Sequence, residues 1–185
     1  MRVNLQVMRN SLSLAVVLGL FVAGARVTAQ APDIKPGPEH AVLKQSVGTW
    51  DATVRSQGNK ESKGTANCKM GMNGLWMLEH FKTEIDGKPF EGAGAISYDQ
   101  AKKKYINVWI DSLSTTPMIS EGTYDKATKT MTFGFDIPMP DGKAMKATTI
   151  TVYRDPETKT FTLNGAGPDG KGFEMLHITY KRRTQ

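Results

Sequence analysis

The sequence predicts an all-β fold, namely a closed, up-and-down antiparallel barrel of about ten strands preceded by a short helix. From residue 48 onward the chain consists of short runs in which apolar and polar residues alternate, a pattern typical of half-buried strands. The connections between these runs are too short for crossover helices, so neighbouring strands should be antiparallel. Ten strands in one open sheet would expose two unpaired edges, and closure into a barrel removes them.

Residues 1–29 are expected to be a secretory signal peptide. Two arginines precede an apolar run from Leu14 to Ala25, and Val27-Thr28-Ala29 provides a small-x-small cleavage site. The run is shorter than the roughly 20 residues that span a bilayer, and no cysteine follows it that could receive a lipid anchor. We therefore expect a bacterial protein that is periplasmic or secreted, with no membrane span after cleavage.

The leader also supplies half of the net charge. It contains three arginines and no acidic residue, so its removal leaves 21 basic against 18 acidic residues and lowers the net charge from +6 to +3. The basic residues form no coherent face interleaved with aromatic residues, which argues against nucleic-acid binding. Cys68 has no second cysteine with which to form a disulfide. Beyond a flexible segment at residues 30–38, residues 39–185 have the size of a single domain.

A short helix is expected just before the first strand. Pro36-Gly37-Pro38 opens this segment and Gly48 follows it, which is the usual asymmetry of proline at a helix start and glycine after its end. Leu43 and Val47 lie about one turn apart and would share a face. We expect residues 39–47 to pack as a lid over one mouth of the barrel.

The expected strands follow in order along the chain. Their approximate bounds are residues 48–56, 62–72, 75–85, 89–98, 105–111, 118–124, 130–136, 143–154, 160–166 and 172–181. A two-sheet sandwich is the alternative, but sandwiches usually need longer Greek-key connections than this chain provides.

The turns support this assignment. Three Asp-Gly pairs supply residues that tolerate positive φ at hairpin ends, namely Asp86-Gly87, Asp141-Gly142 and Asp169-Gly170. Three other loops open with an aspartate whose carboxylate can accept backbone N–H groups and stabilise a type I turn, namely Asp99, Asp125 and Asp155. The predicted topology is a meander of hairpins.

The two ends of the predicted barrel resemble a known pattern. Gly48-Thr49-Trp50 opens the first strand after a short helix, and Arg182 closes the last strand. This resembles the calycin, or lipocalin-like, pattern, in which the tryptophan plugs the barrel floor and a basic residue of the last strand stacks over it. The resemblance implies a structural barrel floor made of Gly48, Trp50 and Arg182.

A second resemblance spans nearly the whole mature chain. The motifs are similar to those of the bacterial domain-of-unknown-function family 1579 (DUF1579), which implies a lipocalin-like barrel and no established activity. They are Pro36-Gly37-Pro38-Glu39-His40, Gly48-Thr49-Trp50, Phe90-Glu91-Gly92-Ala93-Gly94, Ser97-Tyr98-Asp99, Lys103-Lys104-Tyr105, Trp109-Ile110-Asp111-Ser112, Glu121-Gly122-Thr123-Tyr124-Asp125 and Tyr180-Lys181-Arg182.

The fifth strand separates two kinds of side chain. Ile106, Val108 and Ile110 lie on one face, whereas the opposite face alternates aromatic and polar residues from Tyr105 to Asp111. If the second face points inward, it lines a cavity with stacking surfaces and hydrogen-bonding groups, and eight strands already enclose room for one small ligand. The leading hypothesis is a carrier or sensor of a small, largely apolar molecule, with a cavity lined by Trp76, Phe90, Tyr98, Tyr105, Trp109 and Asp111.

The fourth strand contains glycines at alternate positions. Gly92 and Gly94 leave one strand face nearly bare, which can admit a ligand or a bulky ring from a neighbouring strand. A sharp bend needed for barrel closure is the other explanation. The sequence leaves these explanations open.

Two alternatives to ligand carriage remain open. One is a structural or interaction module whose barrel is a filled core and whose partner docks outside. The other is a haem or metal protein, because the nitrobindins, a resembling barrel family, hold haem through one histidine. Of His40, His80 and His177, His80 is the better candidate to point inward, because it shares a face with Trp76 and Leu78. Soft ligands at Cys68, Met70 and Met72 could suit Cu(I), but a buried core strand explains them equally well, and no cofactor is expected.

The sequence shows no catalytic constellation. It has no Gly-x-Ser-x-Gly elbow, no His-Glu-x-x-His and no phosphate-binding glycine loop before a helix. Glu79 and His80 are adjacent on one strand and should point to opposite faces. The sequence therefore favours binding over catalysis.

Overall fold

The computed structural model describes residues 34–56, 61–139, 141–167 and 170–184. The expected signal peptide at residues 1–29 lies outside the described residues. No helix in the described ranges combines the length and the apolarity needed to cross a bilayer.

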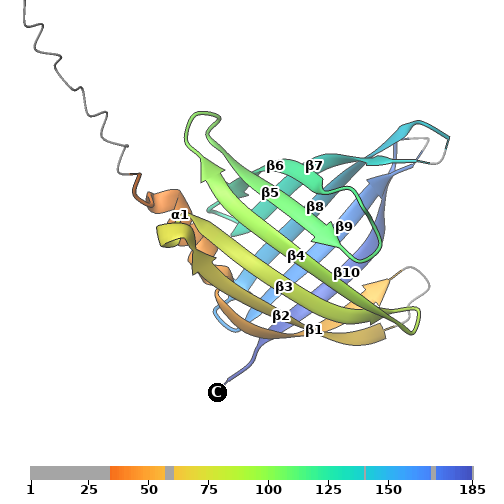
Figure 1. Ribbon diagram of the computed structural model, residues 1–185, viewed down its shortest axis with the longest axis horizontal. Coiled ribbons are helices and arrows are strands. Elements are labelled where there is room, and N and C mark those ends of the chain that lie inside the picture. Colours follow the sequence, from red (N-terminus) through yellow and green to blue (C-terminus); the bar gives the residue numbers. More distant parts are fainter. Residues whose placement is uncertain (1–33, 57–60, 140, 168–169, 185) are drawn as a thin grey trace, which may run out of the picture. The chain divides into compact units, whose positions relative to one another are not determined.

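Ten strands form one closed barrel (Figure 1), which confirms the predicted up-and-down topology. Each strand pairs antiparallel with its neighbours in sequence, and β1 pairs with β10 to close the barrel. The strands are β1 (Gly48–Ser56), β2 (Glu61–Gly71), β3 (Trp76–Ile85), β4 (Lys88–Asp99), β5 (Lys104–Asp111), β6 (Met118–Asp125), β7 (Thr130–Pro138), β8 (Ala144–Asp155), β9 (Thr158–Ala166) and β10 (Gly172–Arg182).

The lid is helical over nearly the predicted range. The lid consists of α1 (Pro38–Leu43) followed by the 3-10 turn η1 (Lys44–Ser46). A second 3-10 turn, η2 (Met72–Gly74), separates β2 from β3, because Met72 and Asn73 adopt positive φ values of 49° and 56°. The strand that was expected to run to Met72 therefore ends at Gly71.

The turns have the predicted chemistry. Asp86 and Gly87 both have positive φ, at 51° and 75°, as a two-residue type I′ hairpin requires. The Asp99 carboxylate accepts the backbone N–H groups of Ala101 and Lys102 at 2.9 and 3.0 Å. Asp125 and Asp155 accept backbone N–H groups two residues further along in the same way.

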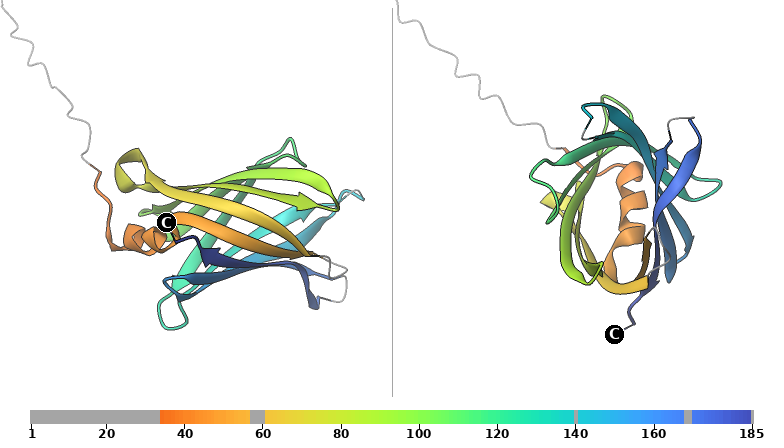
Figure 2. Two further views of the ribbon diagram at one scale, coloured as in Figure 1. Left: turned by 90° about the horizontal axis from the view of Figure 1, so that it is seen from below. Right: turned by 90° about the vertical axis from the view of Figure 1, so that its right-hand side faces the viewer.

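The helix α1 covers one end of the barrel. Seen from the other end, it lies across the far opening (Figure 2). Leu43 is 1% exposed and packs into the core with Val42. The Gly37 N–H donates to Nδ1 of the buried His40 at 3.0 Å, and this bond stabilises the first turn of the helix.

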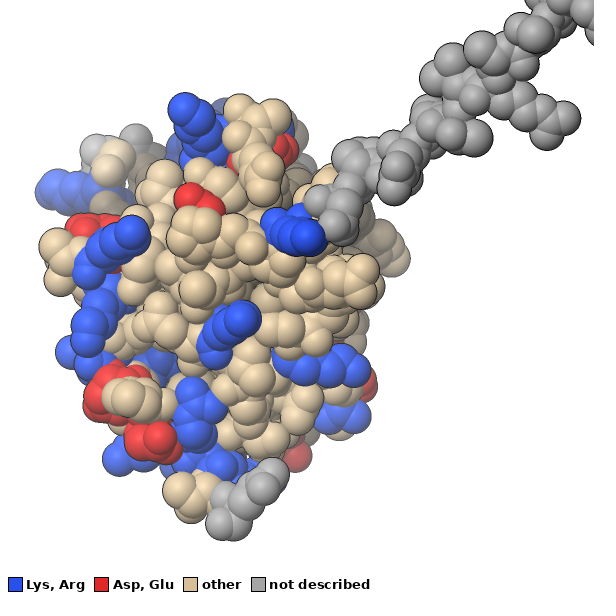
Figure 3. All heavy atoms as spheres, turned by 90° about the vertical axis from the view of Figure 1, so that its left-hand side faces the viewer, with Lys and Arg blue, Asp and Glu red and all other residues tan. Residues whose placement is uncertain are grey.

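Seen from the side of α1, the surface shows lysine, arginine and acidic side chains scattered among uncharged ones (Figure 3). Acidic partners accompany several of the cations. Glu121, for example, accepts hydrogen bonds from Lys102 at 2.6 Å and Lys104 at 3.1 Å. This face carries no broad patch of one charge.

Candidate ligand-binding cavity

The helix-covered end of the barrel is tightly packed around Trp50. This side chain is 1% exposed, and its indole Nε1 donates to the Ser46 carbonyl at 2.8 Å. The hydroxyls of Ser46 and Tyr153 lie 3.0 Å apart, within hydrogen-bond distance. The helical segment is thereby joined to the inner side of β1 and β8.

Arg182 lies against Trp50 and joins both chain ends of the barrel. Its guanidinium carbon is 4.1 Å from the centre of the indole ring, which is cation–π geometry. The guanidinium donates to the carbonyls of Val47, of Gln45 at 3.2 Å and of Pro156 at 2.8 Å. Gly48 has a φ of +131°, and a Cβ there would overlap the guanidinium, so the floor of the barrel requires glycine at this position.

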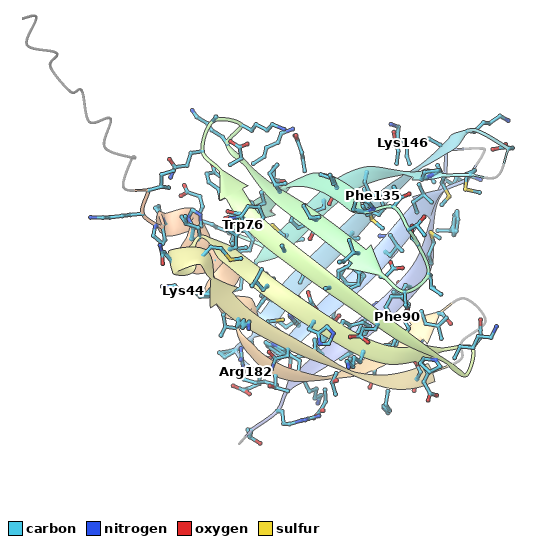
Figure 4. All side chains as sticks on the ribbon, viewed as in Figure 1. Lys44, Trp76, Phe90, Phe135, Lys146 and Arg182 are labelled. Carbon is cyan, nitrogen blue, oxygen red and sulfur yellow. The ribbon has the colours of Figure 1, made fainter. Side chains whose placement is uncertain are left out.

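Beyond this floor the barrel contains an internal cavity of about 290 Å³, so its side chains do not fill it. Every strand except β2 contributes to the wall. Figure 4 shows Arg182 and Lys44 at the helix-covered end, and Phe90 and Phe135 farther along the barrel toward the end opposite α1. The lining residues are Val54, Glu79, Phe81, Thr83, Ile85, Phe90, Ile96, Asn107, Trp109, Asp111, Met118, Phe133, Phe135, Thr149, Thr151, Phe161, Leu163, Leu176, Ile178 and Tyr180.

The aromatic and polar face of β5 is the one that points inward. Asn107, Trp109 and Asp111 line the cavity. Ile110, on the opposite face, is 55% exposed. The aliphatic face of this strand therefore belongs to the outer surface.

The bare face of β4 accommodates the Trp109 ring. A Cβ added at Gly92 would overlap this indole, and one added at Gly94 would lie 3.1 Å from it. Gly94 is also the cross-strand partner of Trp109. Of the explanations that the sequence left open, a bulky ring from the neighbouring strand is the one realised here.

Asp111 holds the Trp109 ring in place. The indole Nε1 donates to one carboxylate oxygen of Asp111 at 2.9 Å, and the Leu113 N–H donates to the other at 2.9 Å. Both oxygens of Asp111 are therefore engaged. The carboxylate orients an aromatic wall of the cavity and begins the loop after β5.

The expected lining residues fall into two groups. Phe90, Trp109 and Asp111 line the cavity together. Tyr98 and Tyr105 lie instead under α1, since the Tyr98 ring packs edge-on to His40 and the Tyr105 hydroxyl donates to the Glu39 carbonyl at 3.1 Å.

Trp76, the sixth expected lining residue, belongs to neither group. It lies on the opposite face of β3 from Met77, Phe81 and Thr83, which are buried. The physical reason is the strand period of two, because inward positions on β3 are the odd-numbered ones. The expectation that Trp76 lines the cavity is corrected by this placement.

The same alternation corrects the expectation for His80. Its side chain is 48% exposed, and Nε2 lies 2.5 Å from Oε1 of Glu91 on the outer face of the barrel. Nδ1 of His177 lies 3.2 Å from the hydroxyl of Thr162, and Ile178 next to it is buried in the core. No histidine of the described residues lines the cavity.

Two of the three sulfur residues share the inward face of β2. Cys68 is buried and Met70 packs against the same core, but Met72 is 62% exposed because the strand ends at Gly71. Burial, followed by the negative charge of Glu79, raises the pKa of the Cys68 thiol to about 12. Within the described ranges, no three His, Cys, Asp or Glu side chains come together as a metal site.

Sequence reasoning missed two charged residues inside the barrel. Glu79 alternates with Met77 and Phe81 on β3, and Lys159 alternates with Phe161 and Leu163 on β9. Lys159 is 4% exposed, and its ammonium lies 4.8 Å from the Trp50 ring centre and 4.9 Å from the Tyr180 ring centre. A charge in register with apolar residues on one strand face was the signal available in the sequence.

Burial also affects the tyrosines around these charges. The pKa of Tyr180 lies well above 10.0, chiefly because the side chain is desolvated and secondly because Glu79 is nearby. Desolvation likewise raises the pKa of Tyr105 to about 12, with a smaller effect from Glu39. These hydroxyls remain neutral hydrogen-bonding groups at neutral pH.

The fold and the cavity define a ten-stranded, up-and-down β barrel with internal space for a small molecule. The chain belongs to the DUF1579 family, described as proteins of unknown function, whose family model matches residues 35–182. This confirms the family resemblance. A comparison with curated proteins finds no match.

Two solved structures are similar to this chain at low sequence identity. Rv2717c from M. tuberculosis aligns with a TM-score of 0.56 and 13% identity over 80% of this chain and 99% of that chain. At that identity its likeness concerns the fold alone. A de novo designed fluorescence-activating β barrel aligns with a TM-score of 0.45 and 19% identity over 77% of this chain and 97% of that one.

Proposed function

We propose that this protein is a carrier or sensor that binds a small, largely apolar molecule inside the barrel. The observation that supports the proposal most directly is the cavity of about 290 Å³ with its predominantly aromatic and aliphatic wall. Ligand sites in proteins are typically preformed cavities of this make-up, with a few polar groups that orient the ligand. No other described feature of this chain offers comparable enclosed apolar space.

The cavity wall suits a flat or aliphatic ligand. Phe90, Trp109 and Phe161 present aromatic surface to it, and such rings contribute large contact areas at small entropic cost. Thr149, Thr151 and Asn107 add isolated polar groups. A ligand that buries mostly apolar surface gains about 25 cal/mol per Å² removed from water.

Export of the protein is part of the same proposal. The arginine-flanked apolar run and the Val27-Thr28-Ala29 site support cleavage before Gln30 and release into the periplasm or the medium. Fractionation of expressing cells, with the intact mass of the exported protein, tests this step. A mass that still includes residues 1–29 would contradict it.

Cavity binding can be tested with the apolar dye Nile red. We expect the purified protein to increase its fluorescence and Thr149→Trp, which adds a ring inside the cavity, to weaken binding at least about tenfold, the loss that follows from removing about 1.4 kcal/mol of contact. Thr148→Trp is the matched control, because Thr148 is exposed on the outer face of the same strand. Equal binding by both variants would contradict the proposal.

Native mass spectrometry of the protein from its own host identifies the natural ligand. A co-purifying mass that is absent from the Thr149→Trp variant and present with Thr148→Trp would be the cavity ligand. The same spectra report any haem or metal.

A docking function at the outer surface is the second candidate. Ile110 and Ile119 are 55% and 62% exposed on the neighbouring strands β5 and β6, and Leu113 in the loop between these strands is 71% exposed. Exposed apolar clusters of this kind occur at protein interfaces. If Ile119→Lys abolished partner capture while Nile red binding persisted, the outer surface would be the functional one.

A further inference from the structure

A small void lies between the main cavity and the barrel floor. Its volume is about 40 Å³, which is space for a water molecule or a single polar head group. Glu79 and Tyr180 line both this void and the main cavity, whereas Lys159 lines the void alone. A ligand in the main cavity therefore borders Glu79 and Tyr180 directly, and a head group that enters the void borders Lys159 as well.

The polar groups of Glu79, Lys159 and Tyr180 at the inner end of the cavity have no hydrogen-bond or ion-pair partner among the described residues. Every fully enclosed side-chain N or O atom in the described ranges does have a partner. The Glu79 carboxylate and the Tyr180 hydroxyl therefore face open space in the barrel, and the Lys159 ammonium lies over the Trp50 and Tyr180 rings without a hydrogen-bond acceptor.

Asp111 shows the contrast within the same cavity. Its two carboxylate oxygens already accept from the Trp109 indole and the Leu113 N–H. The inner end, by contrast, retains charged groups without hydrogen-bond partners, with an acceptor at Glu79 and a donor at Lys159. A buried polar group without a hydrogen bond is costly, so a ligand that completes both gains affinity.

The opposite charges at the inner end determine which head group fits. A carboxylate can pair with Lys159 but brings a second negative charge beside Glu79, and an amine can pair with Glu79 but brings a second positive charge beside Lys159. In a dry cavity such like-charge contacts are weakly screened and costly. A neutral group that both donates and accepts can satisfy Glu79 and Lys159 at once.

We infer that the inner end of the cavity selects apolar ligands with a neutral head group that donates and accepts hydrogen bonds, such as a hydroxyl or a carboxamide. Carboxylates and amines of the same chain length bind more weakly. This inference rests on the proposed function and specifies its ligand class.

The test compares three probes with the same eight-carbon chain at pH 7: 1-octanol, octanoate and octylamine. Their affinities are measured by displacement of Nile red and by calorimetry. Because each ion places a like charge beside Glu79 or Lys159 whereas the hydroxyl places none, we expect 1-octanol to bind at least about tenfold more tightly than either ion. This comparison uses the unaltered protein and needs no variant to fold.

Two variants should each strengthen the binding of a different ion relative to 1-octanol. Glu79→Gln removes the negative charge, so octanoate should gain about tenfold relative to 1-octanol. Lys159→Met keeps an apolar side chain between the two rings, and octylamine should gain by a similar factor. Glu91→Gln is the control, because Glu91 is 56% exposed on the outer face and should leave the order unchanged.

The outcomes separate this inference from the proposed function. Equal affinities for the three probes, or the same order in both variants, would overturn the inference while Nile red binding upheld the cavity as a ligand site. Failure of Nile red to bind at all, or binding that Thr149→Trp does not weaken, would overturn both.

Discussion

The two ends of the barrel interior differ in how completely they are packed. At the helix-covered end, Trp50, Ser46 and Arg182 are joined by hydrogen bonds and a cation–π contact, and Trp50 is 1% exposed. Toward the end opposite α1, the barrel contains an open cavity of about 290 Å³ whose wall includes aromatic side chains. One part of the core is therefore packed, and another part leaves the space in which we propose that a ligand binds.

The difference follows from what fills the space. At the floor, one large indole and the lid residue Leu43 occupy the volume. In the cavity, aromatic rings stand along the wall, and glycines let one of them, Trp109, lie flat against β4. Substitutions at the floor should therefore affect folding, and substitutions in the wall should affect binding as well.

The largest effect is expected at the floor. Trp50→Ala should lower the free energy of unfolding by about 3 to 5 kcal/mol, because it opens a cavity and leaves Arg182 without its stacking partner. Urea denaturation measures this change. Trp76→Ala removes the same ring from the outer face of β3 and should cost much less. A loss below about 1 kcal/mol for Trp50→Ala would show that the floor does not carry the stability.

A smaller effect is expected in the wall. Gly92→Ala places a Cβ where the Trp109 ring lies, so the ring must shift into the cavity. We expect a loss of about 1 to 3 kcal/mol in unfolding free energy together with weaker Nile red binding. Gly134→Ala is the control, because a Cβ there meets open space. If both variants bound the dye as the wild type does, Trp109 would not shape the cavity.

An alkaline titration tests whether water reaches the barrel floor around Cys68. The folded protein raises the pKa of Cys68 from 9.0 to about 12. Because the folded pKa is the higher one, the contribution of the thiol to stability is complete below pH 9 and is lost as the pH rises toward 12, by at most about 1.4 kcal/mol per pH unit. Cys68→Ala should therefore reduce the fall in unfolding free energy above pH 9.

Urea titrations of both proteins at pH values from 8 to 11 provide this comparison. The tyrosines that also titrate in this range are present in both, so the difference isolates the thiol. Parallel curves, or rapid modification of Cys68 by a thiol reagent at pH 8, would mean that the floor admits water.

The smallest effect is expected on the outer surface. Glu121 pairs with Lys102 and Lys104, and the three side chains are 39%, 55% and 49% exposed. Exposed pairs of this kind contribute about 0 to 1 kcal/mol. Glu121→Gln should change the unfolding free energy less than any of the substitutions above and leave dye binding unchanged. A larger loss in urea denaturation would show that surface charges, in addition to the floor, hold the barrel together.

Much of the site could be predicted from local pattern. The period of two on β5 separated Trp109 and Asp111 from Ile110, and the Gly92 and Gly94 pattern indicated space for a ring. Alternation alone does not say which face is inside, because both faces of β5 contain large apolar side chains. Trp76 and His80 were assigned inward for this reason, whereas Glu79 lies on the inward face.

Lys159 illustrates a second limit of the sequence. A lysine on a strand is most often solvated, so its position in register with Phe161 and Leu163 did not mark it as internal. Its burial depends on Trp50 and Tyr180, which lie on two other strands and supply aromatic faces for the ammonium. Such a three-strand environment exists only after the barrel has closed.

The strand number, the hairpin turns and the family could be predicted from the chain alone, because they depend on alternation, on Asp-Gly turn chemistry and on local motifs. Which faces point inward, how much of the interior stays empty and that Glu79, Lys159 and Tyr180 line one void became clear only from the closed barrel. The physical reason is that closure joins β1 to β10 and brings side chains from distant strands together, and no local pattern specifies the volume left between them.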